Sequence, residues 1–163
     1  MTDLEVMEIA IQEAKTALSK SNFPVGAVLL INKEIIDKSQ NQNRELGTLC
    51  FHAENSLLIK HSSLIKQAVQ GKDFVEIYST LEPCLYCFAG ILQHNIHRLV
   101  FSVSDPNVGA SSILPYLNDW YRKKNITIEK NILVDTYLPI LYEDNKRYNR
   151  YDWDKLLALN NRK

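Results

Sequence analysis

The sequence predicts an α/β fold, a three-layer α/β/α sandwich in which a mixed five-stranded sheet is covered by helices on both faces. Segments with apolar residues at helical spacing alternate with short apolar runs of the kind that form buried strands. The first two strands follow each other directly, whereas the later strands are separated by helices, which predicts a mixed sheet. A length of 163 residues suits one domain with one substantial core.

The first element is predicted to be a helix that ends at Ser21-Asn22. Thr2 and Glu5 have the spacing of a capping box at its start. Apolar residues then recur at helical spacing and predict a buried stripe. The stripe comprises Leu4, Val6, Ile9, Ala10, Ala14, Ala17 and Leu18.

The rest of the chain alternates between predicted strands and helices. Two apolar runs flank Asn32-Lys33, which suits the tight turn of a hairpin. The last helix is expected to be bent, because Pro139 is tolerated only in a first turn. The predicted strands are 25–31, 34–39, 74–79, 98–103 and 126–129, and the later helices are 52–70, 83–94, 113–123 and 135–159.

Charge and composition give no sign of a nucleic-acid or membrane partner. Lys plus Arg and Asp plus Glu both number 19, so no long-range attraction to a polyanion is expected. The densest basic run, 122–124, is interpreted as a solvated helix end. The N-terminus lacks the features of a signal peptide, and the longest apolar run, 23–31, is too short to span a bilayer. We therefore expect a cytoplasmic protein. The chain has three cysteines, and an odd number argues against a disulfide framework.

Two short motifs carry the chemistry of this chain. In the first, Glu54 stands two residues after His52, and in the second Pro83 directly precedes a Cys-x-x-Cys formed by Cys84 and Cys87. Each motif lies where a predicted helix begins. One helical turn separates the two cysteines, so their sulfur atoms share one side of the helix. A helix start favours thiolates, because its N–H groups are unpaired and its dipole is positive there.

The ligand set predicts a catalytic zinc site. Structural zinc sites close with four protein ligands, whereas catalytic sites use three and keep a position for water. His52, Cys84 and Cys87 supply three ligands, and bound zinc lowers the pKa of its water to about 7. Attack on an amino-substituted ring carbon also needs a proton shuttle, for which Glu54 lies near the metal without being a ligand. We predict one Zn²⁺ per chain, with a bound water or hydroxide, and Glu54 as the catalytic acid/base.

Taken singly, neither motif is specific to one chemistry. A lone Cys-x-x-Cys also occurs in redox and structural sites. Two further classes therefore stay open: a non-catalytic, zinc-stabilised binding subunit, and a thiol-disulfide oxidoreductase using Cys84 and Cys87. The first needs an unusable acid/base, and the second leaves His52 and Glu54 without a role. Cys50 is expected to be a small buried side chain and not a fourth ligand.

The combined His-x-Glu and Pro-Cys-x-x-Cys pattern is the signature of zinc deaminases that act on nucleobases. With it, the chain resembles the cytidine deaminase superfamily, and within it the branch of bacterial tRNA adenosine deaminases, guanine deaminases and yeast-type cytosine deaminases. The resemblance runs from about residue 4 to residue 144. Four segments carry it: Pro-Val-Gly-Ala-Val at 24–28, Asn41, His-Ala-Glu at 52–54, and Thr-Leu-Glu-Pro-Cys-Leu-Tyr-Cys at 80–87.

This resemblance implies a site, a domain and a partner. Val25 would pack on the base and Asn41 would hydrogen-bond its ring. The backbone N–H of Ala53 would reach the ring, and that of Cys84 would contact the zinc-bound oxygen. Residues 1–163 would form a single deaminase domain, with 145–163 as a divergent helical tail. Family members usually pair through helices around the active site, which implies a homodimer.

The substrate is predicted to be adenosine within tRNA, converted to inosine. The loop 104–110 is similar to the Asp-Pro-x-x-Gly-Ala loop of tRNA adenosine deaminases, in which the aspartate, here Asp105, lies near the nucleotide flanking the target. A plain turn accounts for Asp105 equally well. Residues 47–51 and 144–148 depart from that family, and the aromatic tail 148–153 would suit closure over a small base. A free base or nucleoside, such as guanine, cytosine or adenine, is therefore the alternative substrate.

Overall fold

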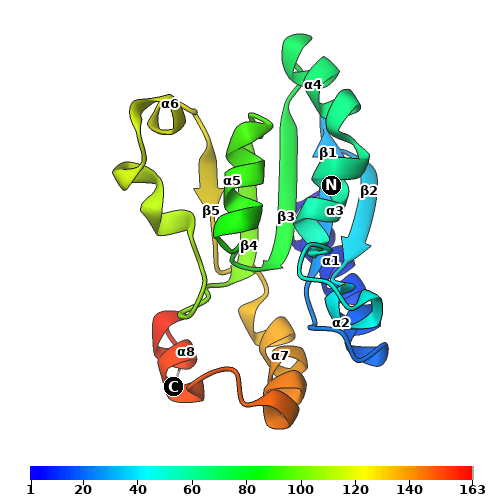
Figure 1. The fold of residues 1–163 in the computed structure, drawn as a ribbon, viewed down its shortest axis with the longest axis vertical. Helices are drawn as coiled ribbons and strands as arrows, with labels where there is room; N and C mark the ends of the chain where they lie inside the picture. The colour runs from blue at the N-terminus through cyan, green and yellow to red at the C-terminus, as the bar shows by residue number, and fades with distance from the viewer. Residues whose placement is uncertain (163) are drawn as a thin grey trace.

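In the computed structural model, which describes residues 1–162, one five-stranded sheet has the order β2-β1-β3-β4-β5 (Figure 1). β1 pairs antiparallel with both β2 and β3, while β3 with β4 and β4 with β5 are parallel. The sheet is therefore mixed, as the sequence predicts. Its strands are β1 (Gly26–Ile31), β2 (Glu34–Gln40), β3 (Val75–Leu81), β4 (Arg98–Val103) and β5 (Thr127–Glu129).

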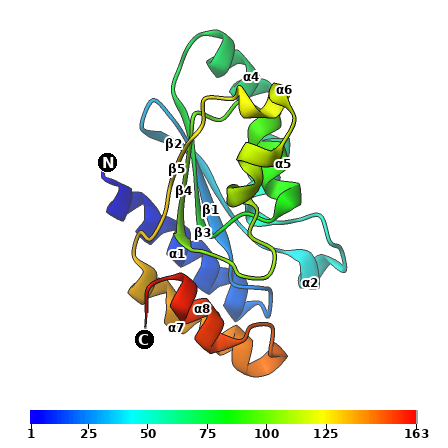
Figure 2. The same cartoon turned by 90° about the vertical axis from the view of Figure 1, so that its left-hand side faces the viewer.

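Helices cover both faces of this sheet, which confirms the predicted three layers. Seen edge-on in Figure 2, the sheet has α1, α7 and α8 on one side and α4, α5 and α6 on the other. The larger helices are α1 (Asp3–Ser19), α3 (Ala53–Lys60), α4 (Ser62–Gln70), α5 (Leu85–Gln93), α7 (Val134–Tyr148) and α8 (Trp153–Leu159). Three short turns of helix complete the set: α2 (Asn43–Leu46), η1 (Ser111–Tyr116) and α6 (Asp119–Arg122). No helix in residues 1–162 is long and apolar enough to cross a membrane.

The N-terminal helix and the hairpin form as predicted, with one exception. The capping box of α1 is complete, since Thr2 N donates to Glu5 Oε2 (2.7 Å) and Glu5 N donates to Thr2 Oγ1 (3.3 Å). The residues of the hairpin turn, Asn32 and Lys33, both have positive φ, at 51° and 66°, as a two-residue turn of this kind requires. Leu4 is exposed, contrary to the prediction, because it lies in the first turn at the edge of the buried stripe.

Close packing fixes the strand that leads into the candidate site. A Cβ atom built on Gly26 would lie 2.1 Å from the carbonyl oxygen of Ala10 and 2.6 Å from the backbone nitrogen of Ala14. Helix α1 therefore crosses β1 at a distance that only glycine permits. The backbone N–H of Gly26 also donates to Thr80 Oγ1 on β3 (3.1 Å). These contacts hold the preceding residue, Val25, at the end of the sheet.

Three predicted helices are interrupted. The predicted helix 52–70 breaks at His61 into α3 and α4, and the His61 ring lies 2.7 Å from Asp37 Oδ2. The predicted helix 113–123 is replaced by η1, which contains Pro115, and by α6. The predicted helix 135–159 is divided into α7 and α8. Pro139 lies in the second turn of α7 and not in its first, which removes one hydrogen bond close to the helix start.

Candidate metal centre and active site

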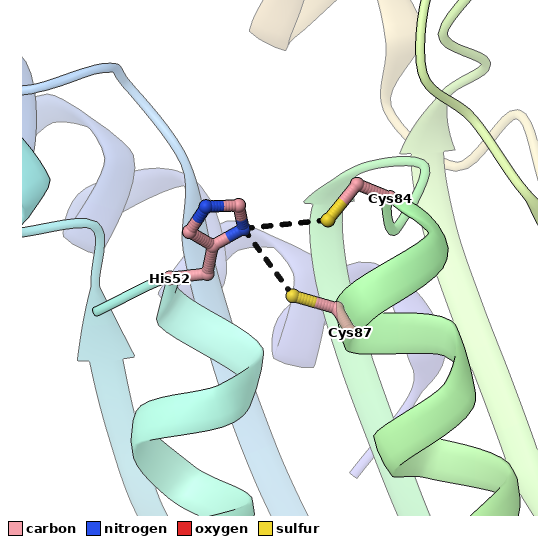
Figure 3. A group of neighbouring side chains, drawn as sticks. All are labelled: His52, Cys84 and Cys87. Atoms are coloured by element: carbon pink, nitrogen blue, oxygen red, sulfur yellow. Dashed lines mark hydrogen bonds between the residues drawn. The ribbon is translucent and has the colours of Figure 1, made fainter. Parts of the chain in front are cut away.

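The two sequence motifs meet at the starts of two neighbouring helices. His52 is the N-cap residue of α3 and Cys84 is the N-cap residue of α5, both with extended backbone. Cys87 lies in the first turn of α5, one turn after Cys84. Because α3 and α5 pack against each other on the same face of the sheet, the imidazole and both thiols point toward one another, as Figure 3 shows.

The geometry of these three side chains fits a zinc ion. His52 Nδ1 lies 3.5 Å from Cys84 Sγ and 3.4 Å from Cys87 Sγ, and the three ligand atoms lie within 4.8 Å of one another. A tetrahedral zinc with bonds of about 2.3 Å to sulfur and about 2.0 Å to nitrogen separates such N and S atoms by about 3.5 Å. In residues 1–162 no other group of three His, Cys, Asp or Glu side chains meets this criterion.

Cys50 does not take part in this cluster. It is exposed, so the prediction of a small buried side chain is wrong. Its backbone N–H donates to Thr48 Oγ1 (3.2 Å), which places it in the surface turn that follows α2. The side chain therefore points away from the core, and the three-ligand set of the cluster stands without it.

The protonation of the two thiols suits a cation. The Cys87 thiol beside Cys84 lowers the pKa of Cys84 to about 4, and the His52 ring adds to this effect. The Cys84 thiolate in turn raises the pKa of Cys87, and burial raises it further. Contact with Cys84 raises the pKa of His52. A cation held among the three groups would replace the protons that they share, since thiolate and neutral imidazole are the forms that bind zinc.

Glu54 lies beside the cluster without belonging to it. Only 3% of the residue is exposed. Its Oε1 accepts a hydrogen bond from Ser79 Oγ on β3 (3.0 Å), and its Oε2 lies 3.5 Å from Cys87 Sγ. Burial raises the pKa of the Glu54 carboxyl above its usual range. A carboxyl that is oriented by a hydroxyl and has a raised pKa is suited to take up and return a proton.

A cavity of about 550 Å³ opens onto this centre. Its wall contains six of the residues that the sequence singles out: Val25, Asn41, His52, Glu54, Cys84 and Asp105. Ala53, the first residue of α3, is buried between His52 and Glu54. The structure thus brings the predicted zinc ligands, acid/base and substrate residues into one place.

Asn41 and Asp105 are both fixed by local hydrogen bonds. Asn41 N donates to Val25 O (2.9 Å), and Asn41 Oδ1 accepts from Asn43 N (3.0 Å). Asp105 Oδ1 accepts from the backbone N–H groups of Asn107 (2.8 Å) and Val108 (3.1 Å), which is the arrangement of an Asx turn. The turn interpretation of Asp105 therefore holds, and its contact with a substrate stays a prediction.

Sequence reasoning missed several residues of the cavity wall. Among them are Phe23, Asn43, Arg44, Thr48, Leu49 and Arg150. Arg150 belongs to the aromatic tail that the sequence marks as divergent, which was the only signal for it. Thr48 and Leu49 lie in the segment 47–51, which also departs from the family. Phe23, Asn43 and Arg44 carry no motif, and only the folded chain brings them to the cavity.

The comparisons with known proteins agree with this geometry. The family profile described as "Cytidine and deoxycytidylate deaminase zinc-binding region" matches residues 1–103. The chain is 37% identical over 105 residues to a tRNA-specific adenosine deaminase of Agrobacterium fabrum, covering 64% of this chain and 67% of that protein. It is 38% identical over 115 residues to a tRNA-specific adenosine deaminase of Rickettsia bellii, covering 69% and 78%.

Solved structures share the fold. A chain from a study of A-to-I editing by tRNA:A34 deaminases superposes with a TM-score of 0.67 and 28% identity, covering 84% of this chain and 99% of that one. A guanine deaminase from Nitrosomonas europaea superposes with a TM-score of 0.67 and 17% identity, covering 89% and 85%. The second likeness is one of fold alone.

Proposed function

Because the chain belongs to the cytidine and deoxycytidylate deaminase zinc-binding family, we propose that it hydrolyses the exocyclic amine of adenosine within tRNA, giving inosine and ammonia. The observation that carries the chemistry is a buried carboxylate, Glu54, beside a His-Cys-Cys cluster at a cavity. The identity to tRNA-specific adenosine deaminases supports the choice of substrate.

Each residue of the site has a separate task in this reaction. His52, Cys84 and Cys87 hold zinc, one ion per chain, and when bound it supplies a water molecule of lowered pKa as the nucleophile. Glu54 accepts a first proton from the attacking water and passes it to the ring nitrogen; it then takes the second proton from the added hydroxyl, which becomes the oxo group, and gives it to the amino group, which leaves as ammonia. Ser79 keeps the carboxylate oriented through its hydrogen bond to Oε1.

The remaining wall residues bind and orient the base. Val25 offers an apolar surface to the ring. Asn41 has its side-chain oxygen engaged by Asn43 N, which leaves its amide N–H groups to donate to an acceptor on the base edge. Ala53 begins α3, where a backbone N–H has no partner within the helix and is available to the ring. Asp105 lies in the wall where a flanking nucleotide would pass.

A second copy of the chain is the proposed partner. Large apolar side chains are exposed on the helices and the loop around the metal centre, and an exposed apolar patch of this kind marks a surface that binds a partner. They are Leu49, Phe51, Ile59, Leu85 and Tyr86, and Leu49 is 84% exposed. Pairing of two copies across α3 and α5 would cover them.

The mass measured by sedimentation tests this dimer. The wild type should sediment with twice the chain mass of 18.8 kDa, and the Ile59→Glu variant with the mass of one chain. A wild-type monomer at micromolar concentration would exclude the dimer.

A free base or nucleoside is the competing substrate, and two observations favour it. The formal net charge of the chain is zero, which weakens long-range attraction to RNA. The C-terminal segment also reaches the cavity wall, as closure of this segment over a small base would require. The predicted cytoplasmic location suits either substrate and suits reduced ligand cysteines.

Ammonia release separates these substrates. We expect turnover of a tRNA anticodon stem-loop with adenosine at the wobble position to exceed that of adenine, guanine, cytosine and adenosine at equal concentration. Added salt should weaken RNA turnover steeply, because phosphate contacts release counterions. Efficient, salt-insensitive turnover of a free base would reject the tRNA assignment and keep the deaminase chemistry.

A further inference from the structure

The short segment between α7 and α8, residues 149–152, is irregular and yet is firmly held at the cavity. Asn145 bonds both backbone groups of Tyr151, with Oδ1 accepting from N (2.8 Å) and Nδ2 donating to O (3.3 Å). Asn107 Nδ2 donates to the carbonyl of Arg150 (2.9 Å), and Tyr151 OH donates to Asp105 Oδ2 (2.8 Å). Fixing an irregular segment costs conformational entropy, which these bonds offset. Figure 1 shows this segment at the end of the molecule where α2 lies.

This segment presents the guanidinium of Arg150 at the cavity. Arg150 is one of the residues that line the cavity, and its side chain is 44% exposed. The guanidinium lies over the ring of Phe23, 4.5 Å from its centre, and Phe23 also lines the cavity. Its one ion pair within residues 1–162 is a long contact of 3.5 Å from Nε to Asp144 Oδ2. A guanidinium has five N–H donors, so most of them remain for a ligand.

A second arginine explains why Arg150 stays available. Asp144 is only 1% exposed at its side chain, and Arg44 occupies both of its oxygens, at 2.7 and 3.4 Å. Arg44 also donates to the carbonyl of Ser21 (3.0 Å) and lies over the ring of Tyr148. Two guanidinium groups thus share one carboxylate, so this side of the cavity carries one excess positive charge.

Besides Glu54, two carboxylates line the cavity, those of Asp105 and Glu82, and both are already engaged. Asp105 accepts from two backbone N–H groups and from the Tyr151 hydroxyl. Glu82 accepts from Asp105 N (3.1 Å) and from the backbone and hydroxyl of Ser111 (3.0 and 2.6 Å). Since donors surround both acidic groups, their repulsion of an anion beside Arg150 is reduced.

We propose that Arg150 binds a phosphate group attached to the nucleoside being deaminated, so that the substrate of this site is a nucleotide unit and not a bare base or nucleoside. This inference rests on the proposed deaminase function. The planar fork of an arginine matches phosphate oxygens with paired hydrogen bonds. A cavity of about 550 Å³ lies in the range of drug-sized ligands, which leaves room for a sugar and a phosphate beyond the base.

Kinetics of Arg150→Ala test this proposal. The substrates are adenosine, its 5′- and 3′-monophosphates, and the stem-loop RNA. We expect the kcat/KM of a phosphate-bearing substrate, divided by that of adenosine, to fall at least tenfold, mainly through KM. Arg150→Lys should restore part of the ratio. If the ratio falls with the monophosphates, Arg150 binds the phosphate of a free nucleotide as well as that of RNA. If the ratio falls with RNA alone, Arg150 binds only a phosphate within a polynucleotide.

Arg147→Ala is the matched control, because Arg147 is an exposed arginine of the same tail that lies outside the cavity wall. It should leave the ratio unchanged. An unchanged ratio in Arg150→Ala, or an equal loss on adenosine, would overturn the proposal. If the wild type released no ammonia from any substrate, the proposed function would fail. Binding of adenosine 5′-monophosphate and of the stem-loop would then decide: at least tenfold weaker binding of either by Arg150→Ala supports the phosphate site, and equal affinities for both exclude it.

Discussion

Replacing Glu54 with glutamine is expected to lower kcat by a factor of about 10² to 10⁴, the range typical for loss of a positioned acid/base. Glutamine keeps the size of the side chain, and its carbonyl oxygen can still accept from Ser79. It cannot take up a proton from water or deliver one to the ring nitrogen and the leaving amine. KM should change far less than kcat, because the lost interaction belongs to the transition state. Ammonia release, measured over a range of substrate concentrations up to saturation, gives both constants.

Two controls separate chemistry from structure in this experiment. Zinc content should be unchanged in Glu54→Gln, since Glu54 is outside the three-ligand group. Ser79→Ala removes only the 3.0 Å hydrogen bond to Glu54 Oε1, and a hydrogen bond worth about 1 kcal/mol predicts a loss of roughly fivefold. Full turnover by Glu54→Gln would show that another group carries the proton.

The metal centre could be predicted because its residues are set by local sequence. Cys84 and Cys87 are one helical turn apart, and Pro83 marks the helix start, so their relation depends on a single element. His52 and Glu54 have the same local relation at the start of α3. The resemblance to deaminases supplied what spacing could not, namely that the two helix starts face each other and that Val25 and Asn41 end beside them.

The rest of the site depends on contacts between distant parts of the chain. Arg150 reaches the cavity because Asn107, 43 residues earlier, holds its carbonyl. The buried Asp144 pairs with Arg44, which lies 100 residues before it. No pattern of spacing encodes such pairs. The exposure of Cys50 was mispredicted for a related reason, because composition favours burial of cysteine and only the path of the loop after α2 decides it.

Removal of the metal is expected to destabilise the chain as well as inactivate it. A ligand that binds only the folded state stabilises by about 2.7 kcal/mol when its concentration is 100 times Kd. For a chain of 163 residues, 1 kcal/mol shifts Tm by roughly 2 to 4 °C. Chelation should therefore lower Tm by roughly 5 to 11 °C relative to protein in free zinc at that level. Thermal melts with and without chelator, followed by zinc re-addition, measure this shift.

Two cysteine variants assign that shift to the cluster. Cys87→Ser replaces a fully buried ligand, so bound zinc, activity and the chelator-dependent part of Tm should be lost together. Cys50→Ser changes an exposed thiol outside the cluster, and all three quantities should stay as in the wild type. The pair matters because both substitutions remove one thiol from a chain with three, so only position relative to His52 distinguishes them. Stoichiometric zinc in Cys87→Ser, or loss of zinc in Cys50→Ser, would mean that the metal is held by a different set of side chains.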